Sequence, residues 1–468
     1  MTSLKRFIGP RDFYKLVFAV AVPIMIQNGI TNFVSLLDNL MVGRMGTEQM
    51  SGVAIANQLL FVFNLCIFGG LSGAGIFTAQ FHGSRDTHGV RDTFRFKLIT
   101  VAIVLVIGLC LCIFFGEDLI RLYLKGEEDV GNIDATAAYG LSYLRVMLIG
   151  LVPFCLMQTF ASTLRETGET VLPMKASIVS VLTNLVLNYL LIFGKLGLPA
   201  LGVIGAAIAT VIARFIELII VLIGTYRHTD RHGFIVGAFR SLKIPAALTG
   251  HIIRRGMPLL ANELLWSVGM AFLTQCYSAR GLSVVAAQNI SSTISNFFNI
   301  VFMALGSAVA ILVGQQLGAG KYDEAKTTAS RLMAFSVACC FVIGGLLAIA
   351  APLIPHLYKT TEEVRKLSTN FLWICAGCMP IFSFAHCCYF TLRSGGKTLI
   401  TFIFDCAYVW IVVIPLVYTL VHYTNLSITQ IFFCGQFIDI VKCIIGGWMV
   451  KKGIWINRIV TDSPKETT

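Results

Sequence analysis

The residue in this sequence with the clearest chemistry is Asp38, an acid inside an apolar segment. That segment runs from Pro23 to Gly46 and is long enough to cross a bilayer. A carboxylate near the bilayer centre costs about 2.5 to 3.5 kcal/mol, so such an acid normally faces a protein interior or a wet cavity and serves a function. We predict that Asp38 is an ion-coupling residue. The structural alternative is a buried acid satisfied by neighbouring Asn, Ser or Tyr groups.

Two further acids, Glu263 and Asp405, lie in apolar segments that carry no basic residue three positions away on the same helical face. Each therefore needs a partner from another helix, a cation or a proton. Two other acids have such a basic neighbour and are predicted to form structural pairs: Arg214 with Glu217, and Asp439 with Lys442.

Aromatic residues accompany one of these acids. Asp405 stands close in sequence to Tyr408 and Trp410, and an acid beside aromatic rings can hold an organic cation through its charge and the ring faces. The candidate set for a substrate site or a second coupling site is Glu263, Asp405, Tyr408, Gln27 and Asn28.

The composition decides which elements position these residues. The chain has 468 residues, of which 56% are hydrophobic and 13% charged, against about 25% charged in soluble proteins. Apolar runs of about 20 residues recur, and no polar stretch between them is long enough for a soluble domain. We predict an all-α integral membrane protein with twelve transmembrane helices, at residues 16–43, 47–81, 94–115, 136–160, 171–194, 201–226, 256–279, 284–317, 328–354, 366–392, 398–421 and 427–450.

Lysine and arginine are distributed unevenly over the loops between these helices. With the N-terminus placed inside, most of the 36 basic residues fall on one face, and the acids Glu117, Asp118, Glu127, Glu128 and Asp129 fall on the other. The positive-inside rule then places both termini in the cytoplasm, most simply at the plasma (inner) membrane. The net charge of +12 is explained by this bias and by anionic lipid headgroups, so membrane lipids are expected partners and nucleic acid is not.

Neither cysteine nor histidine forms a metal-binding pattern. The 14 cysteines are scattered through apolar helices, as packing residues are, and the histidine pair at helical spacing, His228 and His232, lies in a basic loop. We expect no cofactor, and no metal beyond Na+ at Asp38.

Internal repetition divides the chain into two halves. Pro23 recurs as Pro258 and Gly83 as Gly318 at one constant offset, and TLRETGET at 163–170 recurs as TLRSGGKT at 391–398. Six helices return the chain to its starting side, so the halves should have the same topology and be related by an axis along the membrane normal. The predicted organisation is an N-terminal six-helix lobe (1–226), a cytoplasmic linker with a short surface helix (227–255), a C-terminal six-helix lobe (256–450) and a cytoplasmic tail (451–468).

These motifs together resemble the multidrug and toxic compound extrusion (MATE) transporters over nearly the whole chain. The resemblance rests on Asp38-x4-Gly43-Arg44-x-Gly46, on TAQFHGSRD with its repeat VGQQLGAGK, on the LR-x-x-G-x-T turn of each half, and on NLVLNYLLIFG followed by LGVIGAAIAT. It implies export of organic, often cationic, compounds from the cytoplasm in exchange for H+ or Na+, by alternating access of two lobes. We expect a monomer with small organic substrates.

The resemblance also implies a cation site in the N-terminal half. Asp38 matches the first-helix aspartate of that site, and Asn184, Asn188 and Thr210 match the positions on the fifth and sixth helices that complete it. Asn188 departs from the pattern because many relatives carry aspartate there, which leaves Na+ and H+ both open as the coupling ion. Asn184 and Asn188 are four residues apart and share a helical face, which suits two amide oxygens at one cation, although Asn pairs also join helices.

In the C-terminal half, Glu263 resembles the seventh-helix glutamate of the NorM-type branch. The tenth-helix aspartate that accompanies it there is missing from MPIFSFAHCCYFTLR. Two alternatives to drug export remain. A flippase for lipid-linked precursors would share the fold, but the unpaired charges here are acidic rather than cationic. An intramembrane enzyme would need a nucleophile–base or H-E-x-x-H pattern, and the sequence has none visible.

Overall fold

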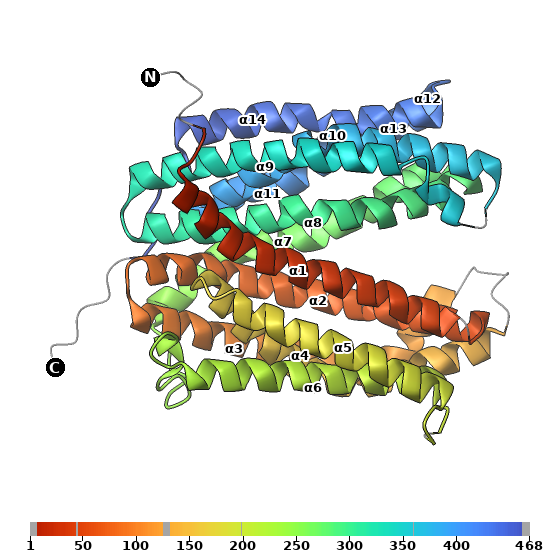
Figure 1. The fold of residues 1–468 in the computed structure, drawn as a ribbon, viewed down its shortest axis with the longest axis horizontal. Coiled ribbons are helices and arrows are strands. Elements are labelled where there is room, and N and C mark those ends of the chain that lie inside the picture. The colour runs from red at the N-terminus through yellow and green to blue at the C-terminus, as the bar shows by residue number, and fades with distance from the viewer. Residues whose placement is uncertain (1–6, 44, 125–131, 198, 359, 461–468) are drawn as a thin grey trace. The chain divides into compact units, whose positions relative to one another are not determined.

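The computed structural model describes residues 7–43, 45–124, 132–197, 199–358 and 360–460. This part of the chain is helical throughout, with no strand (Figure 1). The α-helices are α1 (Arg11–Gly43), α2 (Thr47–Gly83), α3 (Thr87–Leu124), α4 (Ile133–Glu166), α5 (Val171–Phe193), α6 (Gly202–Arg227), α7 (Ala246–Ser278), α8 (Leu282–Gly318), α9 (Tyr322–Ala350), α10 (Glu362–Ser394), α11 (Thr398–Phe402), α12 (Ile414–Tyr423), α13 (Ile428–Phe437) and α14 (Asp439–Lys452).

Twelve of the helical stretches in the described residues are long and apolar enough to span a membrane, which confirms the predicted all-α membrane fold. The first ten correspond to α1 through α10. The eleventh runs from Thr398 to Tyr423 and the twelfth from Ile428 to Lys452. Several helices extend beyond their predicted ends; α3, for example, covers 38 residues, because its first and last turns carry charged residues and hydropathy alone does not report them as helix.

The eleventh span is interrupted by two π-helical turns that the sequence did not predict. They are η4 (Ile403–Ala407) and η5 (Val409–Val413), and α12 follows with Pro415 in its first turn. Proline has no N–H to donate to the preceding turn, so the hydrogen bonding of that turn must adjust. π-turns inside α-helices are rare and are frequent at functional sites. Asp405 lies in the first of them.

Side-chain caps define several helix starts. The side chain of Asn132 accepts a hydrogen bond from the N–H of Ala135 at the start of α4. Ser427 and Gln430 form a reciprocal capping box at the start of α13. Such caps satisfy backbone N–H groups that have no partner within the helix, and so fix where each span begins.

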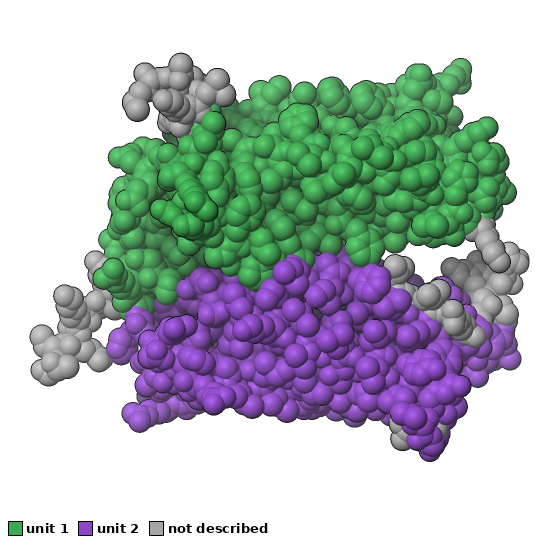
Figure 2. Space-filling model, viewed as in Figure 1, with its two compact units in different colours: residues 1–25, 79–86, 251–468 green, residues 26–78, 87–250 purple. Residues whose placement is uncertain are grey.

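The chain forms two compact units, coloured separately in Figure 2. Unit 1 comprises residues 1–25, 79–86 and 251–468, and unit 2 comprises 26–78 and 87–250. In unit 2, α6 packs against α4 and α5, and α3 packs against α4. In unit 1, α10 packs against α8, α9 and α14. The division into the lobes 1–226 and 256–450 remains a prediction.

The internal repeat is visible as a reciprocal contact inside unit 1. A Cβ atom added to Gly83 would overlap with the carbonyl oxygen of Gln315, and one added to Gly318 would overlap with that of Gln80. These four positions are two pairs at the same repeat offset as the two prolines. The ends of α2 and α8 therefore touch backbone to backbone, which glycine alone permits.

The segment between the two repeats is anchored rather than free. Within unit 2, the guanidinium of Arg95 on α3 donates to the carbonyl oxygens of Gly237 and Ala238, both at 2.9 Å. Phe234, in the short 3-10 helix η2 (Gly233–Ile235), is buried against Phe94. Helix α7 begins at Ala246, so the predicted short surface helix is instead the continuous start of the seventh span.

The end of the chain is also packed as far as it is described. After α14, Trp455 is buried, and the fully buried Gln80 of α2 bonds to this segment within unit 1. Its side chain accepts from the N–H of Ile459 at 2.8 Å and donates to the carbonyl oxygens of Asn457 at 3.2 Å and Ser394 at 3.0 Å. The rest of the predicted tail, 461–468, lies outside the described residues.

Candidate cation-coupling site

Asp38 lies in the second half of α1, fifteen residues after Pro23, and its side chain is half-buried in unit 2. Its Oδ1 accepts a hydrogen bond of 2.5 Å from the amide Nδ2 of Asn188 on α5. Among the described residues, no lysine or arginine nitrogen lies within 4 Å of its oxygens. The carboxylate is thus oriented by an amide and has no counter-charge in direct contact within the described part of the chain.

A chain of hydrogen bonds continues from Asp38 through the other three predicted residues. Asn188 Nδ2 also donates to Asn184 Oδ1 at 3.1 Å, and Asn184 Nδ2 donates to Thr210 Oγ1 on α6 at 3.1 Å. Thr210 in turn donates to the carbonyl oxygen of Ala206 at 3.0 Å. The four residues that the sequence grouped are therefore neighbours in the structure.

One oxygen in this series of hydrogen-bonded side chains has no partner among the described residues. Asn188 is 1% exposed, and its Oδ1 is buried without a hydrogen bond to any described residue. A buried acceptor without a donor is costly, and such groups call for an explanation such as an ion. An amide oxygen next to a carboxylate is the ligand type that Na+ and other hard cations prefer. The donor set therefore fits a small cation.

Gln27 belongs to a second polar chain of unit 2. Its amide donates to Ser177 Oγ on α5 at 2.9 Å, and Ser177 donates to Glu217 Oε1 on α6 at 2.5 Å. Asn28, also in the predicted set, is half-buried and makes no hydrogen bond to the described residues.

Arg214 and Glu217 do not form the predicted direct pair, although they interact electrostatically at longer range. Arg214 donates to the carbonyl oxygen of Gly150 at 3.2 Å and lies over the ring of Phe154, both on α4, whereas Glu217 bonds to Ser177 on α5. Since α6 packs against both α4 and α5, the two side chains diverge toward different neighbours.

Asp439 and Lys442, the second predicted pair, interact electrostatically, but the direct ion pair of Lys442 is with another acid. In unit 1, Lys442 Nζ bonds to Asp405 Oδ1 at 2.5 Å, and Asn262 Nδ2 donates to Asp405 Oδ2 at 3.1 Å. Asp439 is the first residue of α14, after the break at Ile438, and Lys442 reaches across to the eleventh span instead. The sequence predicts that Asp405 needs a partner from another helix, a cation or a proton. The structure provides Lys442 from another helix.

The remaining members of the predicted set lie around this pair in unit 1. Glu263, next to Asn262 on α7, is half-buried and has no hydrogen bond or ion pair with the described residues. The hydroxyl of Tyr408 donates to the carbonyl oxygen of Ile438 at 2.8 Å. Its ring centroid lies 5.9 Å from Lys442 Nζ, so the cation at this ring is one of the chain's own.

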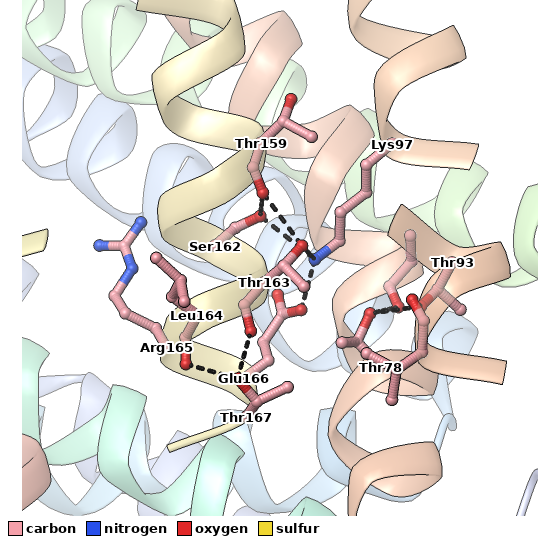
Figure 3. A network of polar contacts seen from close by, with 12 residues as sticks. Thr78, Thr93, Lys97, Thr159, Ser162, Thr163, Leu164, Arg165, Glu166 and Thr167 are labelled. Carbon is pink, nitrogen blue, oxygen red and sulfur yellow. Dashed lines mark hydrogen bonds and ion pairs between the residues drawn. The ribbon is translucent and has the colours of Figure 1, made fainter. Parts of the chain in front are cut away.

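Sequence reasoning missed a second buried lysine, Lys97, which lies near the start of the predicted helix 94–115 and was counted only as one of the basic residues of one face. In unit 2 it is fully buried, and its Nζ bonds to Glu166 and to the hydroxyls of Ser162 and Thr163 at 3.2 and 3.1 Å (Figure 3). Figure 3 shows Lys97 reaching from α3 across to α4, with Arg165 pointing away. The signal available was the i,i+4 spacing of Ser162 and Glu166, which puts both on one face of α4.

Comparison with known proteins decides the family. The model of the family MatE matches residues 23–190 and 258–419, two blocks that begin at the two prolines of the repeat. The chain belongs to the MatE family. Among curated relatives, this MatE chain is 25% identical over 416 residues to "Probable multidrug resistance protein YoeA" of Bacillus subtilis, covering 87% of each chain. It is 24% identical over 436 residues to "Probable multidrug resistance protein NorM" of Thermotoga maritima, covering 92% of this chain and 90% of that protein.

Solved structures share the fold of the MatE chain. One is an outward-facing conformation of a multidrug resistance MATE family transporter of the MOP superfamily, with a TM-score of 0.85 at 19% identity, covering 97% of this chain and 98% of that one. Another is a MOP superfamily transporter from Pyrococcus furiosus, with a TM-score of 0.82 at 19% identity, covering 96% and 98%.

Proposed function

We propose that this MatE chain is a secondary antiporter that exports small organic compounds, often cationic ones, from the cytoplasm in exchange for H+ or Na+. The observation that supports this most is the carboxylate of Asp38, which has an amide chain on one side and no basic partner among the described residues. The names of the relatives, which are multidrug resistance proteins, agree with it.

The coupling step follows from charge. Asp38 without a cation leaves a net negative charge inside the membrane, which is unfavourable, and a proton or Na+ removes it. Na+ would be held by the carboxylate and by Asn188 Oδ1, with Asn184 and Thr210 fixing the orientation of that amide. A proton would sit on the carboxylate, and Asn188 would then keep its bond to one oxygen. Transport is coupled when the loaded and unloaded forms favour different conformations.

We assign the substrate role in unit 1 to Glu263. It is half-buried and makes no hydrogen bond or ion pair with the described residues, and Arg393 interacts with it only at longer range, so an organic cation can pair with it. Asp405 already holds Lys442. We propose no enzymatic step and no cofactor, and we propose that the chain acts as a monomer among membrane lipids.

The proposed setting is the plasma membrane with both termini in the cytoplasm, as the distribution of lysine and arginine indicates. The ends of α2 and α8, Gly83 and Gly318, then lie on the cytoplasmic side. Alternating access would move the lobes 1–226 and 256–450 relative to each other.

The test is ion-driven export by purified protein in vesicles. The wild type should accumulate a fluorescent organic cation against its gradient when a pH or Na+ gradient is imposed, and Asp38→Asn should not, because an amide can neither take up a proton nor carry charge. Asp12→Asn is the matched control, since Asp12 is an exposed acid on the same helix that pairs with Lys15. Ion-driven export at the wild-type rate by Asp38→Asn would refute the role of Asp38, and movement of a lipid pyrophosphate instead would favour the flippase.

A further inference from the structure

The ammonium group of Lys442 is a fixed positive charge beside a carboxylate in unit 1. Its Nζ lies 2.5 Å from Asp405 Oδ1, and the lysine is 8% exposed. Nζ also lies 5.3 Å from the ring centroid of Phe404. Lys442, Phe404 and Tyr408 line an otherwise apolar cavity of about 310 Å³. Asp405 is the acid in direct contact with this ammonium. Asp439 on the same helix also acts on Lys442, and Glu263 on α7 and His386 on α10 act on Asp405, all without a direct bond.

The second oxygen of Asp405 accepts a hydrogen bond from an amide, as the carboxylate of Asp38 does in unit 2. Asn262 Nδ2 donates to Asp405, and Asn188 Nδ2 donates to Asp38. In both amides the Oδ1 atom is buried and has no hydrogen bond within the described residues. Each unit therefore contains a membrane carboxylate beside an amide oxygen that could face a cation. The difference is the ammonium, which is present at Asp405 and absent, as far as the chain is described, at Asp38.

The internal repeat shows that this difference is specific to one half. Asn262 is the counterpart of Gln27 at the offset that relates the two MatE blocks, and Asp405 is the counterpart of Ser177 at the offset that relates the two LR-x-x-G-x-T turns. Gln27 donates to Ser177 just as Asn262 donates to Asp405. The hydroxyl of one half is thus a carboxylate in the other.

The residue that bonds to Ser177 in one half differs in charge from the residue that bonds to Asp405 in the other. Ser177 bonds to Glu217 on α6, whereas Asp405 bonds to Lys442 on α14. Glu217 and Lys442 each lie ten residues before the last residue of their helix. In the C-terminal half, Asp405 therefore stands where the other half has Ser177, and Lys442 bonds to it where the other half has Glu217. The carboxylate of Asp405 is thus accompanied by a positive charge from the same half.

We propose that Lys442 is a tethered cation that keeps Asp405 out of ion exchange, and that it thereby sets the number of ions exchanged per substrate. A tethered group acts at an effective concentration that free ions in solution rarely match, so H+ or Na+ does not displace it. Asp38, which has no lysine in contact among the described residues, remains open to the coupling ion. The inference rests on the proposed antiport function.

The test measures stoichiometry. Vesicles containing wild type or variant are given a series of pH gradients without Na+, or Na+ gradients at equal pH, with the voltage clamped to zero by potassium and valinomycin. The slope of the logarithm of steady-state accumulation of a fluorescent organic cation against the logarithm of the ion gradient is the number of ions per substrate. Each added ion multiplies accumulation about tenfold at a tenfold gradient.

Lys442→Met removes the ammonium but keeps the length of the side chain. It should raise the slope by one in the arm whose ion is coupled, because Asp405 then exchanges an ion of its own. The double variant Lys442→Met/Asp405→Asn replaces the ion pair by neutral groups and should return the slope to the wild-type value. The matched control is Lys97→Met/Glu166→Gln, which neutralises the buried lysine–glutamate pair of unit 2 and should leave the slope unchanged.

Two results would overturn the proposal. One is a Lys442→Met protein that transports with the wild-type slope. The other is a double variant whose slope falls below that of the wild type, which would mean that Asp405 exchanges an ion despite Lys442. The double variant decides this even if Lys442→Met does not fold. Wild-type protein without ion-driven accumulation would instead refute the antiport function, so the two failures are distinguishable.

Discussion

At the scale of single residues, the site of unit 2 depends on which polar atoms remain free once the hydrogen bonds are counted. The Asn188 amide nitrogen donates to both Asp38 and Asn184, and its oxygen is left over among the described residues. Thr210 is one step further away, since within the site it touches Asn184 and not Asp38. Asn188, which contacts Asp38 directly, and Thr210, which does not, should therefore contribute unequally to ion binding.

We expect Asn188→Leu to raise the ion concentration that gives half-maximal export by about ten- to a hundredfold, because it removes a hydrogen bond to a charged group and a ligand oxygen. Thr210→Val, which removes one neutral hydrogen bond, should raise it about two- to tenfold. The measurement is initial export rate against ion concentration in vesicles. Equal effects of the two variants would contradict the order of contacts described for the site.

The sequence was sufficient to group Asp38, Asn184, Asn188 and Thr210 because the helical spacing of the asparagines and the family resemblance agreed. It was not sufficient for the partner of Asp405. Lys442 is 37 residues away on another helix, and local spacing pointed to Asp439 instead. A pairing between helices depends on how they pack, and a periodicity along one helix carries no information about that.

At the scale of elements, hydropathy predicted the twelve spans because each must satisfy its backbone hydrogen bonds internally within an apolar environment. It did not predict the π-turns around Asp405, since the change from an i→i+4 to an i→i+5 bond leaves no trace in average hydropathy. It also gave no sign that Lys97 is buried, because a single charge near the end of an apolar run usually marks the membrane surface.

The contact between α2 and α8 gives a prediction of stability. Gly83→Ala should destabilise the protein by about 1 to 3 kcal/mol, because the new methyl group meets the carbonyl of Gln315 and the helices must separate. Gly345→Ala on α9 is the matched control, since nothing lies within 4 Å of the added Cβ, and it should stabilise by up to about 1 kcal/mol. Thermal unfolding in detergent measures both. A Gly83→Ala protein as stable as wild type would show that the helix ends are not packed this closely.

The buried pair between α3 and α4 gives another. Lys97→Met leaves Glu166 without its ammonium and should destabilise by about 3 to 5 kcal/mol, whereas Lys97→Met/Glu166→Gln should recover most of that loss. Unfolding midpoints of the two variants and of wild type provide the comparison. If the single and double variants were equally unstable, the loss would come from the packing of the lysine stem and not from the broken ion pair.

At the scale of the whole molecule, the proposed orientation in the membrane makes a prediction about access. Asp230, in the segment between the repeats, and the highly exposed Leu196, after α5, lie at opposite ends of helix α6. A cysteine at Asp230 should react with a membrane-impermeant maleimide only in broken cells, and one at Leu196 should react in intact cells. The unsubstituted protein, with its 14 cysteines, is the control for background labelling. The reverse pattern would place the termini outside.

The contact of Gln80 with the end of the chain has a consequence for biosynthesis. Its partner Ile459 is 379 residues away, so at about 5 to 20 residues per second it leaves the ribosome roughly 20 to 75 s later. Until then, a fully buried amide on α2 lacks its acceptor Asn457 and its donor Ile459. A chain cut between Ser394 and Asn457 therefore retains the bond from Gln80 to Ser394 and lacks the other two, so the end of α2 is held by fewer contacts.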